Sequence, residues 1–340
     1  MPAIECRSLT KFYGDVRGVE DVSFTVEDGE VFGFLGPNGA GKTTAIRTLL
    51  GFLSPTRGGA TLLGHDATDP SASRAARERI GYLPGDPGLD ADRTAAAFLD
   101  HQAALRGTGS RESLIDRFGL DESRRIGDLS RGNRQKVALV AAFMHDPELL
   151  LLDEPTSGLD PLLQEEFAAL VRERVDDGAS VLLSSHVLGE VAALCDRVGV
   201  LREGRLAAVE TVDDLRSRGG KQVRARVAED VDREAFEIRG AMNLRIGETV
   251  SFTWTGEYDD LIDLLGRFTV RDLEVIDAPL EEAFMTFYDG DVPGPGRRGE
   301  GGRGKGRRGE GSRGKGRRGE GRQDRASAPA AGTDADGGDR

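Results

Sequence analysis

The sequence predicts an α/β protein with a largely parallel sheet, followed by a small α+β domain and a disordered tail. Short apolar runs, typical of buried strands, alternate with segments of helical composition through residues 3–218. From Lys221 the pattern changes to alternating apolar and polar residues with amphipathic segments. Residues 291–340 consist largely of a Gly/Arg-rich repeat with too few apolar side chains to form a core. We therefore expect domains at residues 1–218, 219–290 and 291–340.

The elements of the first half follow from local patterns. Residues 22–26 alternate between apolar and polar side chains, as a half-buried strand does. Residues 30–35 are an apolar run that stops at a glycine loop, and the segment after the loop has helical composition. Proline and glycine in residues 54–59 favour a turn. The expected elements are strands at residues 4–10, 22–26, 30–35 and 80–83, a helix at residues 42–50 and a turn at residues 54–59.

The second half is interpreted in the same way. Residues 92–145 have a helical pattern, and the four leucines of residues 149–152 indicate a buried strand. Trp254, the only tryptophan, is expected in the core. The other expected elements are helices at residues 162–175, 187–195, 258–267 and 280–288, and strands at residues 180–184, 198–201, 221–227 and 250–254.

Composition excludes several classes of protein. The chain has 340 residues, which corresponds to about two folded domains. Two cysteines exclude a disulfide scaffold and a cysteine-built zinc site, and they fit a reducing cytoplasm. No apolar run approaches the ~18 residues that span a bilayer, and the N-terminus lacks the layout of a signal peptide. We expect a cytoplasmic chain whose membrane role comes through a partner.

Charge is unevenly distributed. Residues 1–290 carry 33 basic and 51 acidic residues, a net charge of −18, whereas residues 291–340 carry +5. An acidic, lysine-poor body suits a cytoplasm of high salt, although a GC-rich genome also favours arginine over lysine. The tail repeat has no aromatic residues to stack on bases and a glutamate in each copy. We therefore interpret it as a solvated tail rather than as a segment that binds RNA or an anionic membrane.

A phosphate-binding loop is the most specific signal. Residues 36–43 match the pattern G-x-x-x-x-G-K-[ST] between a predicted strand and a predicted helix. Glycines let successive backbone N–H groups point inward, and the helix N-terminus adds positive charge, so the loop suits the phosphates of a nucleotide. Lys42 would reach the β- and γ-phosphates and the Thr43 hydroxyl would bind Mg²⁺. The nucleotide-binding residues expected here are Gly36, Pro37, Asn38, Gly39, Ala40, Gly41, Lys42, Thr43 and Thr44.

Two adjacent carboxylates end the strand of four leucines. A buried strand has no structural need for Asp153 and Glu154 at its carboxyl end, which is the edge where open α/β sheets bind ligands. Asp153 is expected to hold Mg²⁺, and Glu154 to act as the general base toward the attacking water. Alone, the pair could be an acidic turn, but after a phosphate loop that interpretation is the weaker one.

Leu129-Ser-Arg-Gly-Asn133 precedes the apolar helix, and here the sequence resembles the ATP-binding cassette (ABC) ATPases. The segment stands where that family carries its signature, L-S-G-G-Q, with Arg131 and Asn133 departing from it. The resemblance implies that Ser130 and Gly132 meet the γ-phosphate. Taken alone, Ser130 would be a plain helix N-cap.

Three further segments extend the resemblance, which covers residues 3–218. The segment ending in Asp160 resembles the family's D-loop at the dimer interface, and His186 resembles its switch histidine, a catalytic residue. Tyr13 resembles the aromatic residue that stacks on adenine; a tyrosine in the core is the alternative. One departure is Gly85, at the position of the family's Q-loop glutamine, whose consequence the sequence leaves open.

The resemblance implies a P-loop NTPase with a RecA-like core and a helical subdomain near residues 86–145. One cassette without a membrane span, with the extension at residues 277–285, looks like the ATPase subunits of type-two exporters. We therefore expect ATP and Mg²⁺ as cofactors, a separate integral-membrane permease as partner, pairing of two ATPase subunits, and no nucleic acid. A soluble ABC ATPase acting on ribosomes or DNA, and a non-hydrolysing nucleotide-binding module, are the alternatives. The resemblance implies export, with the choice of cargo made by the permease.

Overall fold

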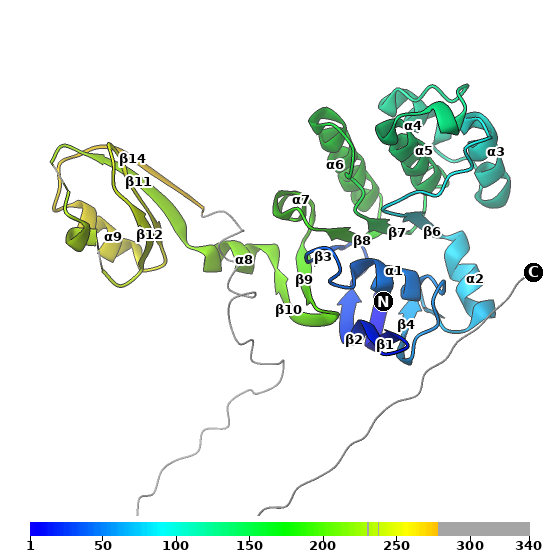
Figure 1. The fold of residues 1–340 in the computed structure, drawn as a ribbon, viewed down its shortest axis with the longest axis horizontal. Coiled ribbons are helices and arrows are strands. Elements are labelled where there is room, and N and C mark those ends of the chain that lie inside the picture. Colours follow the sequence, from blue (N-terminus) through cyan, green and yellow to red (C-terminus); the bar gives the residue numbers. More distant parts are fainter. Residues whose placement is uncertain (230, 237, 278–340) are drawn as a thin grey trace, which may run out of the picture. The chain divides into compact units, whose positions relative to one another are not determined.

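The computed structural model describes residues 1–229, 231–236 and 238–277. The predicted amphipathic helix at residues 280–288 and the predicted tail at residues 291–340 lie outside these residues. Within the described part, no helix has the length and the apolar character needed to cross a lipid bilayer. The described residues form three sheets and the helices that accompany them (Figure 1).

The largest sheet confirms the predicted α/β architecture. Its strand order is β10-β9-β3-β8-β7-β6, with parallel pairing everywhere except at the β10 edge. Parallel neighbours need crossover connections, which is why helices alternate with strands along the sequence. The strands are β3 (Val31–Leu35), β6 (Ile80–Leu83), β7 (Leu149–Asp153), β8 (Ser180–Ser185), β9 (Arg197–Arg202) and β10 (Arg205–Thr211).

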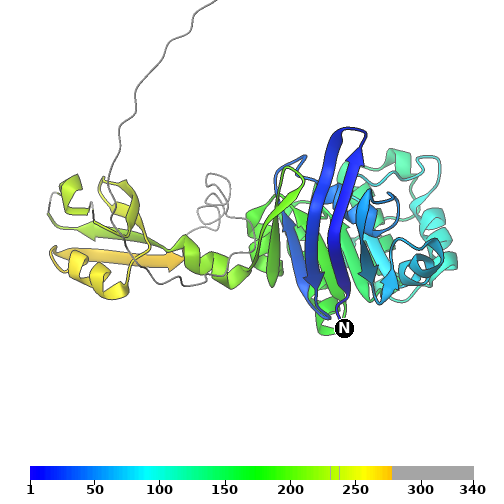
Figure 2. The same ribbon diagram turned by 90° about the horizontal axis from the view of Figure 1, so that it is seen from below.

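Both faces of the central strands β3 and β7 are buried, so these strands are apolar at nearly every position instead of alternating. In β7, Leu150 and Leu152 belong to the core cluster on one face. Leu149 and Leu151 belong to the cluster on the other face. This second cluster also contains residues of the N-terminal strands, which cross the front of the sheet in Figure 2, where they are blue.

The N-terminal strands form a separate antiparallel sheet of order β2-β1-β4-β5. The strands are β1 (Ile4–Tyr13), β2 (Val16–Val26), β4 (Arg57–Leu62) and β5 (His65–Asp66). The expected turn at residues 54–59 is partly wrong, because β4 begins at Arg57. Gly58 makes this pairing possible, since a Cβ there would lie 2.2 Å from the Ser8 carbonyl oxygen.

Five helices flank the sheets of this region. Asp69 caps one of them by accepting hydrogen bonds from the amides of Ser71 and Ala72, and a proline follows the cap. The same combination of aspartate and proline begins α6. The helices are α1 (Lys42–Leu49), α2 (Pro70–Glu78), α6 (Pro161–Asp176), α7 (Leu188–Leu194) and α8 (Val212–Gly219).

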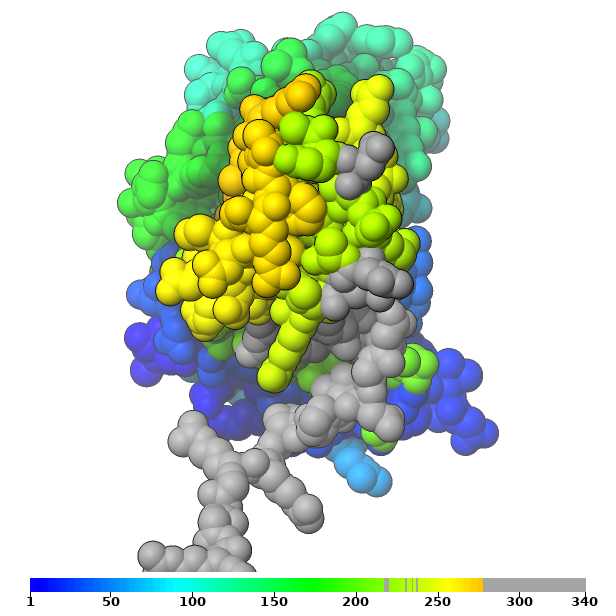
Figure 3. Space-filling view, turned by 90° about the vertical axis from the view of Figure 1, so that its left-hand side faces the viewer, coloured from blue at the N-terminus to red at the C-terminus, as the bar shows by residue number. Residues whose placement is uncertain are grey.

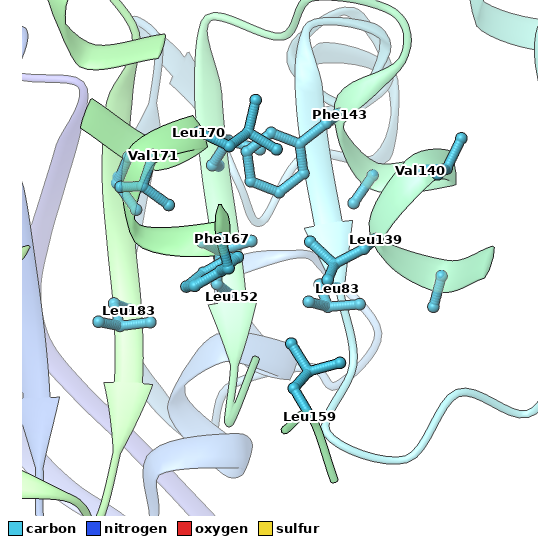
Figure 4. Packing of buried hydrophobic residues seen from close by; sticks show 14 of the residues in the cluster. Leu83, Leu139, Val140, Phe143, Leu152, Leu159, Phe167, Leu170, Val171 and Leu183 are labelled. Atoms are coloured by element: carbon cyan, nitrogen blue, oxygen red, sulfur yellow. The ribbon is translucent and has the colours of Figure 1, made fainter. Parts of the chain in front are cut away.

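The predicted helical segment between residues 92 and 145 is present as three α-helices and a short 3-10 helix. They are α3 (Ala95–Arg106), α4 (Arg111–Phe118), η1 (Ile126–Asp128) and α5 (Arg131–Phe143). Figure 4 shows α5 and α6 packed over β6, β7 and β8, with Phe143 and Phe167 edge to face at 6.3 Å between ring centroids. A truncation of either ring to alanine would cost about 3–5 kcal/mol of stability. This packing holds α5, and hence its N-terminus, against the sheet.

The third sheet is antiparallel, with strand order β12-β13-β11-β14 and one helix, α9, on it. Trp254 is buried in its core, as predicted, and its indole N–H donates to the Glu257 carbonyl at 3.1 Å. The outer strand β14 presents exposed residues along its length, seen as the orange surface in Figure 3. The elements are β11 (Lys221–Val227), η2 (Arg233–Phe236), β12 (Ala241–Arg245), β13 (Val250–Trp254), α9 (Tyr258–Leu265) and β14 (Val270–Asp277).

Candidate functional site

The loop between β3 and α1 is shaped by its glycines. Gly41 caps α1 with φ of 106°, in the left-handed region, and a Cβ there would lie 2.6 Å from the Gly18 carbonyl oxygen. Gly36 is equally restricted, since its Cβ would lie 2.4 Å from the Leu201 carbonyl oxygen. The loop therefore sits directly on the neighbouring backbone, while Pro37, Asn38 and Gly39 at its tip are exposed. An anion at the start of α1 would meet backbone amides here.

Lys42 turns back into this loop. Its side chain is 5% exposed, and its ammonium donates hydrogen bonds to the carbonyl oxygens of Gly36 at 2.6 Å and Pro37 at 3.3 Å. The same Nζ lies 3.0 Å from Glu154 Oε1. That oxygen is buried and no donor is aligned for a hydrogen bond to it, so the contact is an ion pair only. Lys42 thus connects the phosphate loop to the end of β7.

Glu154 joins three segments of the chain. Its backbone has φ of 50°, a left-handed conformation that costs a glutamate about 1–2 kcal/mol. Its amide donates to the Ser184 carbonyl oxygen at 3.0 Å, which ties the turn after β7 to β8. Its Oε2 lies 2.6 Å from His186 Nδ1. The strained turn therefore aims one carboxylate at both Lys42 and His186.

Asp153 lies one residue earlier and is 2% exposed. The Ser184 hydroxyl donates to its Oδ1 at 2.5 Å, which orients the carboxylate at the carboxyl end of β7. Thr43 lies in the first turn of α1, half-buried. Among the described residues no three His, Cys, Asp or Glu side chains gather around one point, so a cation here would need hydroxyl and phosphate oxygens as further ligands.

The glycine loop and the oxygen ligands beside it fit a nucleotide with bound Mg²⁺. At Gly36 and Gly41 the neighbouring backbone leaves no space for a side chain. Glu154 Oε1 is buried, has no hydrogen-bond partner, and lies beside Lys42 of this loop. A carboxylate and a hydroxyl are the oxygen ligands that Mg²⁺ accepts beside phosphate oxygens.

The segment around Ser130 lies elsewhere in the chain. Ser130 caps α5, since its hydroxyl oxygen accepts from the Asn133 amide at 3.3 Å. A Cβ on Gly132 would lie 3.0 Å from the Gly158 carbonyl oxygen, and Arg131 donates to the Ser157 hydroxyl at 3.0 Å. This segment therefore packs on the loop after β7. In the described residues no hydrogen bond or ion pair joins it to Lys42 or to the rest of the phosphate loop.

Asp160 has a local structural role, because its Oδ1 accepts from the Leu163 amide at 3.0 Å and caps α6. Tyr13 ends β1 with 47% of its surface exposed, so the alternative of a core tyrosine is wrong. A Cβ on Gly18 would lie 2.8 Å from the Thr44 methyl group and 2.9 Å from Tyr13 Cε2. Glycine at this position thus brings the Tyr13 ring beside the start of α1.

Sequence reasoning missed the roles of Ser184 and Gln135 in shaping the site, and it left the consequence of Gly85 open. Ser184 orients Asp153, and its position directly before Ser185 and His186 could have drawn attention to it. Gln135 is buried in α5 and donates to the Pro155 carbonyl oxygen at 2.9 Å, a contact with no local sequence signal. A Cβ on Gly85 would lie 3.1 Å from the Asp153 carbonyl oxygen, so the loop after β6 touches the end of β7.

Comparison with known proteins agrees with this geometry. The family model described as ABC transporter matches residues 19–157. The probable multidrug ABC transporter ATP-binding protein YbhF of Escherichia coli (strain K12) is 39% identical over 223 residues, which is 63% of this chain and 38% of YbhF. The bacitracin transport ATP-binding protein BcrA of Bacillus licheniformis is 35% identical over 224 residues, which is 64% of this chain and 72% of BcrA. The chain thus spans little more than a third of YbhF.

Solved structures agree as well. An ATP-binding subunit of an ABC transporter superposes with a TM-score of 0.59 and 33% identity over 63% of this chain and 92% of that one. A dimeric bacterial ABC transporter cassette has a TM-score of 0.57 at 22% identity, over 62% of this chain and 98% of that one, which shows the same fold. The phosphate loop, the fold and these relatives together identify the family: this chain belongs to the ATP-binding proteins of ABC transporters.

Proposed function

We propose that this chain is the ATP-hydrolysing subunit of an ABC transporter that drives a separate membrane permease in export. The observation that carries the proposal is the convergence on Glu154, whose two oxygens lie 3.0 Å from Lys42 Nζ and 2.6 Å from His186 Nδ1. A protein that only binds nucleotide needs the lysine but not a carboxylate held by a histidine.

In this proposal the phosphate loop, residues 36–44, binds the phosphates of ATP through its amides and Lys42, and Tyr13 stacks on the adenine. Thr43 and Asp153 would hold Mg²⁺, which supplies charge neutralisation at the phosphate oxygens. Lys42 is paired with Glu154 in the structure. Phosphate oxygens compete for that ammonium, so nucleotide binding would release one oxygen of Glu154 for catalysis.

Glu154 then acts as the general base, accepting a proton from the water that attacks the γ-phosphate. His186 holds the carboxylate through its Nδ1, and in this proposal its other ring nitrogen would contact the γ-phosphate. The left-handed turn at Glu154 orients the carboxylate before any nucleotide binds, which reduces the reorganisation needed in the reaction.

A second chain completes the site in this proposal. Ser130 is exposed and its segment packs on the loop after β7, so its outward surface is free to meet the nucleotide of another copy. Leu162 and Val187, which follow the same loop and His186, are 69% and 47% exposed. Apolar residues in such positions are suited to burial between two chains. Two copies facing each other would enclose two nucleotides, with Asp160 near the interface.

The permease would dock on a groove of about 240 Å³ between the loop after β6 and helices α3 and α5. The groove is lined by Pro84 and Leu89 of the loop, by Phe98 of α3 and by Ala141 of α5. The same loop reaches the backbone of Asp153 through Gly85. A permease segment pressing on this loop would therefore act on the catalytic edge, and it would hold the chain at the cytoplasmic face of the membrane.

The proposal assigns one role to each predicted domain. Residues 1–218 bind and hydrolyse ATP, residues 219–290 are an accessory domain, and residues 291–340 are a tail without a part in catalysis. Nucleic acid has no place in this scheme.

Glu154→Gln tests the catalytic assignment. The purified variant should bind ATP as the wild type does, because glutamine has the shape of glutamate. Its turnover should fall by about 10²–10⁴-fold, because the general base is lost. Glu165→Gln, at an exposed position of α6, is the matched control and should hydrolyse ATP normally. Turnover above a third of the wild-type rate in Glu154→Gln would remove Glu154 from this role.

The coupling is tested with an integral-membrane protein that co-purifies with this chain. Reconstituted together in vesicles, the two should show ATPase activity higher than that of this chain alone, and Pro84→Glu at the groove should abolish the increase without changing the basal rate. A basal ATPase with no response to the membrane protein would contradict the transport part of the proposal.

A further inference from the structure

Glu190 lies on α7, four residues after His186, and its carboxylate points back toward the switch loop. Its Oε2 accepts a hydrogen bond from the Ser185 hydroxyl at 2.5 Å. The Ser185 oxygen in turn accepts from the Val187 amide at 2.9 Å. The second bond joins the two residues that flank His186, and the first connects this turn to Glu190.

The same carboxylate faces the loop after β7. Burial raises the pKa of Glu190 above its ordinary value, while the nearby hydroxyls of Ser185 and Thr156 lower it and the charge of Glu154 raises it. Thr156 is two residues after Glu154, and Pro155 between them accepts from Gln135 of α5. Glu190 therefore lies between the loop of the general base and the loop of the histidine.

A role in stability alone does not explain this residue. Glu190 Oε1 is buried and has no hydrogen-bond partner in the described part of the chain. A buried carboxylate with one unpaired oxygen costs folding free energy. Gly189, just before it, has open space around it, so the backbone would accept other residues here.

We infer that Glu190 is a positioning residue for hydrolysis, which through Ser185 holds the His186 loop against the Glu154 loop and so maintains the contact between His186 and Glu154. The inference rests on the proposed function, because it assumes that this contact is used in turnover. A displacement of about 1 Å between such groups is enough to lower a rate by up to 10²-fold.

Steady-state ATPase kinetics on the full chain test it. Glu190→Ala should lower kcat by about tenfold or more and leave KM for ATP within twofold, because the phosphate loop is untouched. Ser185→Ala removes the same hydrogen bond from its other end and should lower kcat similarly, which keeps the test valid if Glu190→Ala does not fold. The double variant should be no slower than the slower single variant.

Glu190→Gln is the conservative variant, since its amide oxygen can still accept from Ser185, and it should recover at least half of the wild-type kcat. Glu165→Ala is the matched control. The inference is overturned if Glu190→Ala keeps kcat within twofold of wild type, if Glu190→Gln is as slow as Glu190→Ala, or if the losses of the two single variants multiply. An inactive wild-type chain would contradict the proposed function instead.

Discussion

At the scale of single residues, the site depends on charges that are placed before any ligand arrives. Glu154 pairs with Lys42 on one oxygen and with His186 on the other. Glu190 contributes a further buried carboxylate that is only half bonded. Such groups cost folding free energy, and they are kept where chemistry requires them.

Lys42→Ala should weaken ATP binding, because it deletes the cation at the centre of the phosphate loop. A charge-assisted hydrogen bond contributes about 1.5–3 kcal/mol, so the dissociation constant should rise about 10–100-fold. Titration with a fluorescent ATP analogue measures this. Lys221→Ala makes the same charge change on β11 and should bind as the wild type does. Equal affinities in Lys42→Ala and wild type would contradict the phosphate-loop assignment.

Glu190 also predicts a pH dependence of stability. Its pKa in the folded chain is raised above the ordinary value of 4.5, so the unfolded chain ionises first and stability falls as pH rises from there through the folded pKa. The Glu190→Gln variant has no carboxyl to ionise at this position, so it does not lose stability in this way. The melting temperature of the variant relative to wild type should therefore increase from pH 4 to pH 7. A difference that stays constant between the two pH values would show that burial does not shift the pKa of this carboxyl.

At the scale of elements, the phosphate loop depends on two different properties of glycine. Gly41 needs both a left-handed φ and the absence of a side chain, because the Gly18 carbonyl lies where its Cβ would be. Gly14, in the turn between β1 and β2, has a φ of 60° but open space around it. The loop geometry is therefore set by contact with the antiparallel sheet as well as by backbone preference.

Gly41→Ala and Gly14→Ala separate these two properties. Gly14→Ala should lower the free energy of unfolding by about 1–2 kcal/mol, the cost of a left-handed alanine, without changing ATP affinity. Gly41→Ala should in addition displace the start of α1 and weaken ATP binding by about tenfold or more. Chemical denaturation and nucleotide titration of both variants measure the outcome. Intact ATP binding in Gly41→Ala would show that the loop does not need this close approach.

At the scale of the whole molecule, assembly and charge are linked. In the proposed function, the segment around Ser130 meets the nucleotide bound by the phosphate loop of a second chain. Residues 1–290 carry a net charge of −18, and two such bodies repel each other unless salt screens them. Association should therefore depend both on nucleotide and on salt.

The Glu154→Gln variant should be monomeric without nucleotide and dimeric with ATP and Mg²⁺, more readily in molar salt. Ser130→Arg in the same background should stay monomeric while still binding ATP, because the arginine would block the second half of the site. Light scattering measures both. If Glu154→Gln with ATP stays monomeric at every salt concentration, the site is not completed by a second copy of this chain.

Removal of residues 296–340 should leave both the ATPase rate and the melting temperature unchanged. These residues lie outside the described part of the chain, and the prediction rests on their composition, which lacks apolar side chains for docking. Calorimetry and an ATPase assay on the shortened chain test it. A melting temperature lower by several degrees would show that the tail docks on the acidic body.

Secondary structure could be predicted where a local pattern decides it. The strands β6, β11 and β13 have the predicted bounds, because each is a short run limited by turn residues. Helices α2 and α8 and strands β5, β10, β12 and β14 were missed, because they are short, polar or at the edge of a sheet, where pairing with another strand decides the conformation and propensity does not.

The sequence by itself determined the family resemblance, the parallel core and the residues gathered at its edge. Each of these features depends on residues that are close together in the sequence. A glycine loop between a strand and a helix predicts a phosphate site, and carboxylates directly after an apolar strand predict a ligand site, whatever the arrangement of the other segments. Only the tertiary structure decided that Lys42 pairs with Glu154, that Gly132 packs on Gly158, and that Glu190 accepts a hydrogen bond from Ser185, just before His186. The contact of Glu190 is with Ser185, five residues earlier, whereas the other contacts join residues far apart in the chain. All of them depend on how β7, β8 and α5 pack, which no local pattern encodes.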